Sequence, residues 1–364
     1  MQIQAAVLRS NNGPHTVEDV DLAEPAAGEM RVRITGAGMC HTDLLPRDPG
    51  FMAQPPIVLG HEGSGVVEAV GPGVDSVRVG DHVVLSYDSC RICRNCRSAH
   101  TAYCETFFPR NLDGVGLAAS PIHDATGEPI ASRWFGQSSF ATHSLVTERN
   151  VVAVDPDLPL ELLGPLGCGI QTGAGSVLVA MGVTAGSSIV VFGAGGVGLS
   201  AVMAARVAGA TTIVAVDLHS SRLELARELG ATHTLQADEA DLLSALRETT
   251  GGGADYSFDT TGMPSVIGQA VHALRPSGVC GLVGVQQGDI VLDPMALSVG
   301  RTVMGILEGD AVPQVLIPRL IDLWRQGRFP FDRLVETFPL SRINEAEQAS
   351  MAGKVVKPVL LPGS

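Results

Sequence analysis

Four cysteines stand close together in the segment C-R-I-C-R-N-C-R-S-A-H-T-A-Y-C, which runs from residue 90 to residue 104. Thiolates at such short spacing can surround one zinc ion tetrahedrally and leave no open position, which is the structural kind of zinc site. The sequence therefore predicts a small metal-binding lobe at about residues 88–106, with the ligands Cys90, Cys93, Cys96 and Cys104.

Disulfide pairing is the alternative for these cysteines, and the composition disfavours it. The chain has 7 cysteines, and its first residues, M-Q-I-Q-A-A-V-L-R-S, have neither the basic start nor the apolar core of a signal peptide. We therefore expect a reducing, cytoplasmic compartment, where closely spaced cysteines more often bind metal than pair. Cys280, in the apolar run G-V-C-G-L-V-G, is expected to be a small buried residue.

A second set of potential ligands is spread along the chain. Cys40 lies in G-M-C-H-T-D, His61 in G-H-E-G and Cys168 in L-G-C-G. One histidine and two cysteines are a sufficient ligand set for a catalytic zinc ion whose fourth position stays open. The sequence therefore predicts two zinc ions per subunit, one structural and one catalytic.

The segment G-A-G-G-V-G, which includes Gly193, Gly195 and Gly198, carries the glycines of a dinucleotide-binding fingerprint. The first glycine permits a tight turn, the second lets the backbone approach a pyrophosphate, and the third lets the helix pack on the strand. The expected helix starts within the motif, so N–H groups such as those of Gly196 and Val197 should face the phosphates. A glycine-rich turn that binds nothing is the alternative.

Asp217 lies at the end of the next expected strand, where its carboxylate could accept hydrogen bonds from the adenosine ribose. A 2′-phosphate there would meet like charge, so we expect NAD rather than NADP. Arg222 complicates this expectation, because a nearby arginine can accept a phosphate. An ordinary helix-capping aspartate is the alternative reading of Asp217.

The pattern of apolar residues predicts two kinds of architecture. The first 150 residues look mainly β, with short valine-rich runs that glycine, proline and aspartate interrupt. From about Ser187, apolar runs alternate with helix-period stretches, which is typical of βαβ units around a parallel sheet. The expected segments are Met30–Ile34, Gly63–Val70, Asp81–Leu85, Ile189–Phe192, Val197–Ala208, Thr212–Asp217, Ser220–Leu229, Leu242–Glu248, Tyr256–Asp259, Val266–Leu274, Val279–Val283, Thr302–Leu307, Pro313–Arg325 and Val355–Leu361.

Length and charge exclude several classes of function. The chain has 364 residues, enough for two domains, and its net charge of −14 disfavours nucleic acid, which requires a basic surface. No run of apolar residues is long enough to span a membrane. We therefore expect small-molecule chemistry.

The segment G-H-E-G-S-G-V-V-E-A-V-G (Gly60–Gly71), the cysteine spacing and the dinucleotide fingerprint together resemble the zinc-dependent medium-chain alcohol dehydrogenases. The resemblance runs from about Ala5 to Leu361. It implies an α/β protein with a GroES-like, β-rich catalytic domain, residues 1–170 and 308–364, and an inserted Rossmann NAD-binding domain, residues 171–307.

The resemblance also assigns roles to individual residues. Cys40, His61 and Cys168 match the catalytic zinc ligands, and Glu62 matches an acid that can exchange as a ligand. Thr42 matches the hydroxyl that holds the alcohol, and Asp43 matches a carboxylate that orients His61. Further matches are Thr172 beside the nicotinamide, and His41 and Lys357 as cationic contacts of the pyrophosphate. Turn, cap, core or solvent-exposed roles are the alternatives.

Leu45 departs from the liver-type enzymes of this family, which have a proton-relay histidine at that position. The proton must then leave through His41 or directly to water. Leu45 and the M-C-H-T-D start resemble the aryl-alcohol (benzyl alcohol) branch, which oxidises primary alcohols on aromatic or allylic carbons. By position, the candidates for its substrate pocket are Phe51, Tyr87, Trp134 and Leu307.

The segment between Cys104 and Phe140 is long enough for the extra loop of the dimeric members, so we expect a homodimer rather than a tetramer. One alternative function is that of an S-hydroxymethylglutathione (formaldehyde) dehydrogenase, which shares both zinc sites but needs a cationic anchor for its substrate. Another alternative is a non-catalytic dinucleotide-binding protein, which should have lost some of the catalytic residues.

Overall fold

The computed structural model describes residues 1–363, and the chain divides into two compact units. The first unit contains Met1–Cys168, Val312–Pro318 and the chain from Asp332 onward, so both ends of the chain build it. The second unit contains Gly169–Ala311 and Arg319–Phe331. These boundaries differ from the predicted ones, 171 and 307. Residues 308–311 stay with the second unit, because the buried side chain of Glu308 accepts a hydrogen bond from Gln171.

Two sheets form the framework of the first unit within the described residues. The smaller sheet has the order β4-β1-β2-β7-β8 and contains β1 Gln2–Leu8, β2 His15–Leu22, β4 Ile57–Val58, β7 Ile122–His123 and β8 Pro129–Ile130. The larger sheet has the order β10-β6-β5-β3-β18-β17, with β9 also paired to β3. Its strands are β3 Glu29–Gly38, β5 Glu62–Val70, β6 His82–Leu85, β9 His143–Thr147, β10 Val151–Val154, β17 Val335–Pro339 and β18 Lys357–Leu361.

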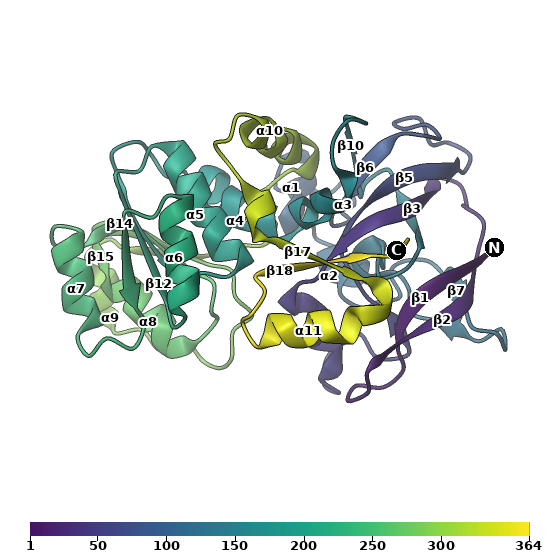
Figure 1. Ribbon diagram of the computed structural model, residues 1–364. Helices are drawn as coiled ribbons and strands as arrows, with labels where there is room; N and C mark the ends of the chain where they lie inside the picture. Colours follow the sequence, from purple (N-terminus) through teal and green to yellow (C-terminus); the bar gives the residue numbers. More distant parts are fainter. Residues whose placement is uncertain (364) are drawn as a thin grey trace. The chain divides into compact units, whose positions relative to one another are not determined.

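Strand β18, near the C-terminal end, pairs antiparallel with β3, near the N-terminal end (Figure 1). The predicted strands Met30–Ile34, Gly63–Val70 and Asp81–Leu85 are confirmed within β3, β5 and β6. The segments between strands form short helices and 3₁₀ turns. They include the 3₁₀ segments His41–Arg47, Trp134–Gly136 and Gly164–Gly167, and the helices α1 Arg94–Arg97, α2 Phe107–Asn111 and α3 Leu160–Leu163.

Helix α11, Ile343–Met351, ties the N-terminal hairpin to the segment after Cys40. The Asn344 side chain accepts from the backbone N–H of His15 and donates to its carbonyl, both at 2.9 Å. Glu347 accepts a hydrogen bond of 2.8 Å from the Arg47 guanidinium and lies 3.3 Å from His15 Nε2. These contacts fix the end of the 3₁₀ segment His41–Arg47 to two elements that are distant in sequence.

A parallel six-stranded sheet is the centre of the second unit in the described chain. Its order is β13-β12-β11-β14-β15-β16, and it contains β11 Ser188–Phe192, β12 Thr212–Asp217, β13 His233–Gln236, β14 Ala254–Asp259, β15 Leu274–Leu282 and β16 Thr302–Gly305. The helices are α4 Gly169–Gly175, α5 Gly196–Ala208, α6 Ser220–Leu229, α7 Leu242–Thr249, α8 Pro264–His272 and α9 Pro294–Ser298. The predicted alternation of strand and helix is confirmed (Figure 1).

Alternating strand residues face different layers of this unit. Val190, Phe192, Val214 and Val216 share one buried cluster with apolar residues of α7 and α8. Both faces of a parallel sheet are covered by helices, which explains the nearly continuous apolar runs in β11 and β12.

Several element boundaries of the second unit differ from the predictions, and one of its strands was not predicted. Helix α8 ends at His272, and Leu274 begins β15 instead of ending a helix. Strand β16 ends at Gly305, before the predicted end at Leu307. Strand β13 has the sequence H-T-L-Q, which is too polar to be recognised as an apolar run. It forms a strand because its backbone pairs with β12. Helix α10, Pro313–Arg325, is confirmed and belongs partly to each unit.

Within residues 1–363, no single helix is both long and apolar enough to cross a membrane. By length and composition alone, one pair of helical segments with a bend between them could do so: Leu160–Gly167 and Gly169–Ala180.

Candidate active site

Cys40, His61, Glu62 and Cys168 come together in the first unit. Their potential ligand atoms all lie within 4.8 Å of one another. His61 and Glu62 are fully buried, Cys168 is buried and Cys40 is half-buried. Cys40 directly precedes the 3₁₀ segment His41–Arg47, and the two adjacent residues His61 and Glu62 lie at the start of β5. Loops and strand ends on one framework thus bring together residues that are far apart in sequence.

Asp43 orients two members of this group. Its Oδ1 accepts hydrogen bonds from His61 Nδ1 at 2.8 Å and from the Gly60 backbone N–H at 3.1 Å. Its Oδ2 accepts from the Cys40 backbone N–H at 3.0 Å. Because the carboxylate accepts from Nδ1, the proton of the neutral ring is on Nδ1 and the Nε2 lone pair is available.

The donor set fits a zinc ion. His61 Nε2 is buried and makes no hydrogen bond, a costly state for a polar atom unless an ion or other group engages it. The neighbouring Cys168 and His61 side chains, working against burial, hold the pKa of Cys40 well below its usual range. Two sulfurs and one imidazole nitrogen are ligands that zinc prefers.

Lys357 has a partner that was not predicted. It is only 4% exposed, and its Nζ donates to both oxygens of Glu62, at 2.8 and 2.9 Å, and to the Met39 carbonyl at 3.0 Å. All three of these acceptor atoms belong to the first unit, and the predicted contact of Lys357 with the pyrophosphate stays a prediction. The alternative of a solvated lysine is wrong. Burial raises the pKa of Glu62 to about 7, although the Lys357 ammonium works in the opposite direction.

Thr42 and His41 begin the same 3₁₀ segment, directly after Cys40. The half-buried Thr42 hydroxyl lies 3.7 Å from the Cys40 sulfur, and His41 is exposed. Leu45 is half-buried in the same segment. Thr42 therefore lies beside the candidate metal ligands, whereas His41 has access to solvent.

The four cysteines of the lobe also come together. Cys90, Cys93, Cys96 and Cys104 place their sulfurs within 4.8 Å of one another. The backbone N–H of Cys90 donates to the Cys104 sulfur, and that of Cys93 donates to the Cys90 sulfur, each at 3.3 Å. Such N–H groups stabilise thiolates, and four sulfurs around one point suit a tetrahedral ion.

The glycine motif of the second unit has the geometry that a dinucleotide requires. Gly193 follows β11 with φ +91°, a conformation that favours glycine. A Cβ at Gly198 would overlap the Gly193 carbonyl oxygen, so the close approach of helix α5 to the turn requires glycine there. By contrast, a Cβ at Gly195 would meet no heavy atom within 4 Å, which leaves space for a ligand. Gly196 and Val197 form the first turn of α5, where N–H groups have no intrahelical partner.

Asp217 is buried at the end of β12 and turned toward the glycine motif. Its Oδ2 accepts from the Ala194 N–H at 2.7 Å, and its Oδ1 accepts from the His219 N–H at 2.8 Å. A guanidinium nitrogen of Arg222 lies 3.9 Å from Oδ2. Arg222 thus points toward the Asp217 carboxylate. The negative charge of that carboxylate remains at the end of β12.

Sequence reasoning missed Glu308. Its side chain is 5% exposed and accepts from Gln171 Nε2 at 3.2 Å and from the Thr172 hydroxyl at 3.5 Å. Thr172 lies in α4, which the π-helical turn Ser176–Ala180 follows. Glu308 has a positive φ of 49°, which is uncommon outside glycine, but no sequence motif marked it.

The four predicted pocket residues have different surroundings. Phe51 and Leu307 are half-buried, and they belong to different units. Tyr87 is 2% exposed, and its hydroxyl makes a 2.6 Å hydrogen bond with Thr101. Trp134 is fully buried, and its N–H donates to Asp43 Oδ1 at 2.9 Å. The assignment to the pocket remains a prediction for Phe51, Tyr87 and Leu307; Trp134 has no exposed surface to offer a substrate.

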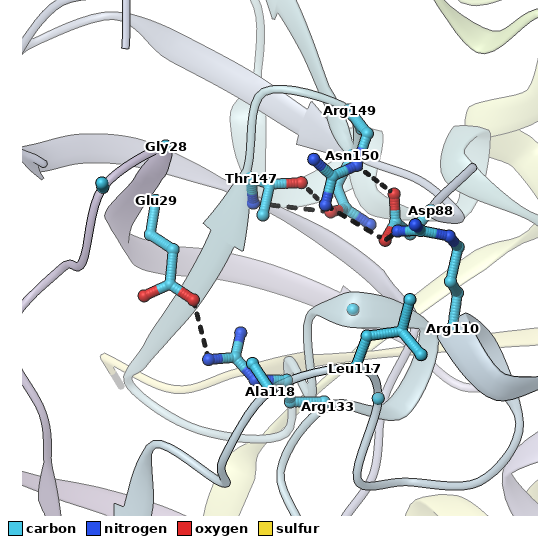
Figure 2. A pocket seen from close by; sticks show the side chains of 13 residues that line it. Gly28, Glu29, Asp88, Arg110, Leu117, Ala118, Arg133, Thr147, Arg149 and Asn150 are labelled. Atoms are coloured by element: carbon cyan, nitrogen blue, oxygen red, sulfur yellow. Dashed lines mark hydrogen bonds and ion pairs between the residues drawn. The ribbon is translucent and has the colours of Figure 1, made fainter. Parts of the chain in front are cut away.

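A polar cavity of about 270 Å³ lies elsewhere in the first unit, and no predicted site residue lines it. Figure 2 shows the side chains around it. Three arginines reach into it, and all are paired with buried carboxylates. Asp88 accepts from Arg110 at 2.8 Å and from Arg149 at 2.7 Å, and Glu29 accepts from Arg133 at 2.7 Å. Arg133 thus links its loop to the first residue of β3, whereas Arg110 and Arg149 meet at Asp88, which lies outside the strands.

Comparison with known proteins identifies the family. Residues 26–156 match the alcohol dehydrogenase GroES-like domain, and residues 196–324 match the zinc-binding dehydrogenase domain. The chain is 49% identical to a geraniol dehydrogenase of Castellaniella defragrans, over 98% of this chain and 97% of that protein. It is 35% identical to a probable S-(hydroxymethyl)glutathione dehydrogenase 1 of Schizosaccharomyces pombe, over 98% and 96% of the two chains.

Among solved structures, a benzyl alcohol dehydrogenase from Acinetobacter calcoaceticus superposes with a TM-score of 0.94 at 43% identity, covering 99% of each chain. The chain therefore belongs to the zinc-dependent medium-chain alcohol dehydrogenases, a family of oxidoreductases that act on alcohols. The predicted fold class, a GroES-like domain with an inserted Rossmann domain, is confirmed.

Proposed function

We propose that this protein oxidises primary alcohols on benzylic or allylic carbons to aldehydes, reversibly, with hydride transfer to NAD. The observation that carries the proposal is the buried group of Cys40, His61 and Cys168, with an unpartnered imidazole nitrogen and the Thr42 hydroxyl beside it. Relatives named for geraniol and for benzyl alcohol support this substrate class, since both compounds are primary alcohols next to an unsaturated carbon.

In this proposal Cys40, His61 and Cys168 hold one zinc ion, and Cys90, Cys93, Cys96 and Cys104 hold a second. Zinc bound at the first site supplies a Lewis acid that lowers the pKa of an alcohol hydroxyl by several units. Thr42 accepts the hydroxyl proton and fixes the alcohol oxygen. NAD held by the second unit would accept hydride from the carbinol carbon, which would leave the aldehyde as product. The exposed His41 passes the proton to water, since Leu45 cannot titrate.

The second unit contributes the cofactor site. The first turn of α5 and the open space at Gly195 accept the pyrophosphate. The buried Asp217 carboxylate, fixed by two backbone N–H groups, faces the ribose and repels a 2′-phosphate. Thr172 packs against the nicotinamide. Initial rates should therefore give a higher kcat/KM with NAD than with NADP, and a preference for NADP would overturn this assignment.

The test of the substrate class is a set of initial rates of NAD reduction by the zinc-loaded protein with benzyl alcohol, geraniol, hexanol and ethanol. Phe51, which is apolar and half-buried in the first unit, should favour the first two alcohols. Equal or faster rates with hexanol and ethanol would keep the zinc dehydrogenase mechanism and discard the substrate class.

The similarity to the Schizosaccharomyces pombe relative favours one second candidate, oxidation of S-hydroxymethylglutathione. That substrate needs cationic groups for its carboxylates, and Arg110, Arg133 and Arg149 are already paired with Asp88 and Glu29. Activity with the glutathione adduct and none with benzyl alcohol or geraniol would reverse our choice. A non-catalytic role is disfavoured because Cys40, Thr42, His61 and Cys168 are all present.

We also propose that the protein is a homodimer. Strand β16 is one of the two edge strands of the parallel sheet in the described residues, so it can pair with a second copy. Val291 and Met295, before this strand, are 85% and 69% exposed. Light scattering coupled to size-exclusion chromatography distinguishes a dimer from a tetramer.

A further inference from the structure

Trp134 lies directly behind the candidate zinc ligands. It is in the 3₁₀ segment Trp134–Gly136 and is fully buried. Its indole Nε1–H donates a hydrogen bond of 2.9 Å to Asp43 Oδ1, the same oxygen that accepts from His61 Nδ1. A residue without exposed surface cannot form the wall of a substrate pocket. The complete burial of Trp134 therefore indicates another role.

Three donors converge on this oxygen. The Gly60 backbone N–H, His61 Nδ1 and Trp134 Nε1 lie 3.1, 2.8 and 2.9 Å from Asp43 Oδ1. An ionised carboxylate has about four acceptor positions on its two oxygens, so Oδ1 has no capacity left. The direction of each donor is therefore restricted by the other two. Indole is the only one of the three donors that comes from outside the segment Gly60–His61.

Ring packing restricts the same histidine. Phe135 stacks on the His61 ring with a centroid distance of 4.3 Å and an interplanar angle of 22°. The Trp134 ring stands edge-on to Phe135 at 5.4 Å and edge-on to Phe51 at 6.2 Å. Trp134 thus contacts the aromatic residue that stacks on the ligand, the carboxylate that orients it, and a candidate pocket residue.

We infer that Trp134 is a positioning residue that acts through Asp43 to hold the His61 ring in the orientation that binds the catalytic metal. The inference rests on the proposed function only in taking Cys40, His61 and Cys168 as zinc ligands. Removal of the indole N–H leaves Oδ1 with two donors, so no buried charge loses all its partners. The expected effect is a looser His61 rather than an unfolded protein.

The test compares Trp134→Phe with Trp324→Phe. The chain has 2 tryptophans, and Trp324, in the part of α10 that belongs to the second unit, packs against Phe331. Each variant and the parent protein are depleted of metal and titrated with Co²⁺, whose visible absorption reports ligand geometry. For Trp134→Phe we expect about 10- to 100-fold weaker Co²⁺ binding at one of two sites and an altered spectrum. Trp324→Phe should match the parent protein.

Two outcomes would overturn the inference. The first is that Trp134→Phe binds Co²⁺ with the parent affinity and spectrum. The second is that its only change is a different KM ratio between benzyl alcohol and hexanol, which would make Trp134 a pocket residue. If the parent protein itself binds Co²⁺ only in the cysteine lobe, the proposed function fails instead, so the two failures are distinguishable.

A second variant separates the N–H group from the size of the ring. Benzothienylalanine, in which sulfur replaces the indole N–H, can be incorporated in place of tryptophan in the Trp324→Phe background. This replacement keeps the ring contacts with Phe51 and Phe135 and removes only the donor to Asp43. Weaker Co²⁺ binding is expected here too, and unchanged binding would attribute any effect of Trp134→Phe to lost volume.

Discussion

The two groups of candidate metal ligands are built in opposite ways. The lobe takes four cysteines from one short segment, and backbone N–H groups of the same segment donate to their sulfurs. The active-site group collects Cys40, His61 and Cys168 from three distant places, and most of it is buried. The lobe is therefore specified by local spacing, whereas the active site depends on the fold that brings its ligands together.

Cys168→Ser gives the largest expected effect and tests the independence of the two groups. It removes a ligand of the active-site group, so turnover should fall by about 10³-fold, which corresponds to roughly 4 kcal/mol of lost Lewis-acid stabilisation. Metal analysis should show one zinc ion per chain instead of two. Loss of both ions would mean that the lobe depends on the active site, against our comparison.

Cys96→Ser makes the converse change. The lobe should lose its ion, and unfolding should become easier by about 3 kcal/mol or more, because loss of a metal is among the large causes of destabilisation. Urea unfolding monitored by circular dichroism measures this change. Turnover per folded molecule at low temperature should stay within a few-fold of the parent; a loss as large as that of Cys168→Ser would contradict a purely structural lobe.

Thr42→Ala refines the comparison within the active site. The variant keeps all three candidate ligands and loses the hydroxyl near Cys40 together with the γ-methyl group, so zinc content should be unchanged. Turnover should fall by about 10²-fold, the usual contribution of a positioned proton acceptor. Thr42→Ser is the matched control and should recover most of the rate. Near-normal turnover of the alanine variant would remove Thr42 from proton transfer.

Glu347 tests the long-range contacts that hold the active-site segment. Burial opposes ionisation of Glu347, but its hydrogen bonds with His15 and Arg47 outweigh burial and lower its pKa. A lowered pKa contributes stability that is fully present above the ordinary value of 4.5 and is lost as the pH falls through the folded-state value. We therefore expect Glu347→Gln to cost about 1–2 kcal/mol at pH 7 and progressively less below pH 4.5.

Urea unfolding of the parent protein and Glu347→Gln at pH 7 and pH 4 measures this difference. Glu345→Gln, on the exposed face of α11 next to Arg342, is the control and should change the stability little at either pH. A constant difference between the parent and Glu347→Gln at both pH values would show that the Glu347 charge has no part in the contact.

Local patterns were sufficient to predict the lobe, the glycine turn and five of the six described strands of the parallel sheet, because each depends on residues close in sequence. Cys40, His61 and Cys168 could be named as candidates from their types and order, and the fold shows that they meet. The pairing of Lys357 with Glu62 was not predicted, because the two residues lie 295 positions apart and leave no local pattern. The hydrogen bond from Trp134 to Asp43 was not predicted for the same reason, since it spans 91 positions. Glu308 was missed because no motif includes it.

Strand β18 lies between β3 and β17, and Lys357, its first residue, bonds to the Met39 carbonyl 318 positions earlier. On the ribosome, the N-terminal strands emerge long before the strand that completes their sheet. The second unit lies in one nearly continuous stretch of the chain, so it can fold before β18 pairs with β3. The stretch Ala37–Gly38 of β3 therefore lacks its β18 partner during most of translation, and the metal site gains its Glu62–Lys357 pair only when synthesis is nearly complete.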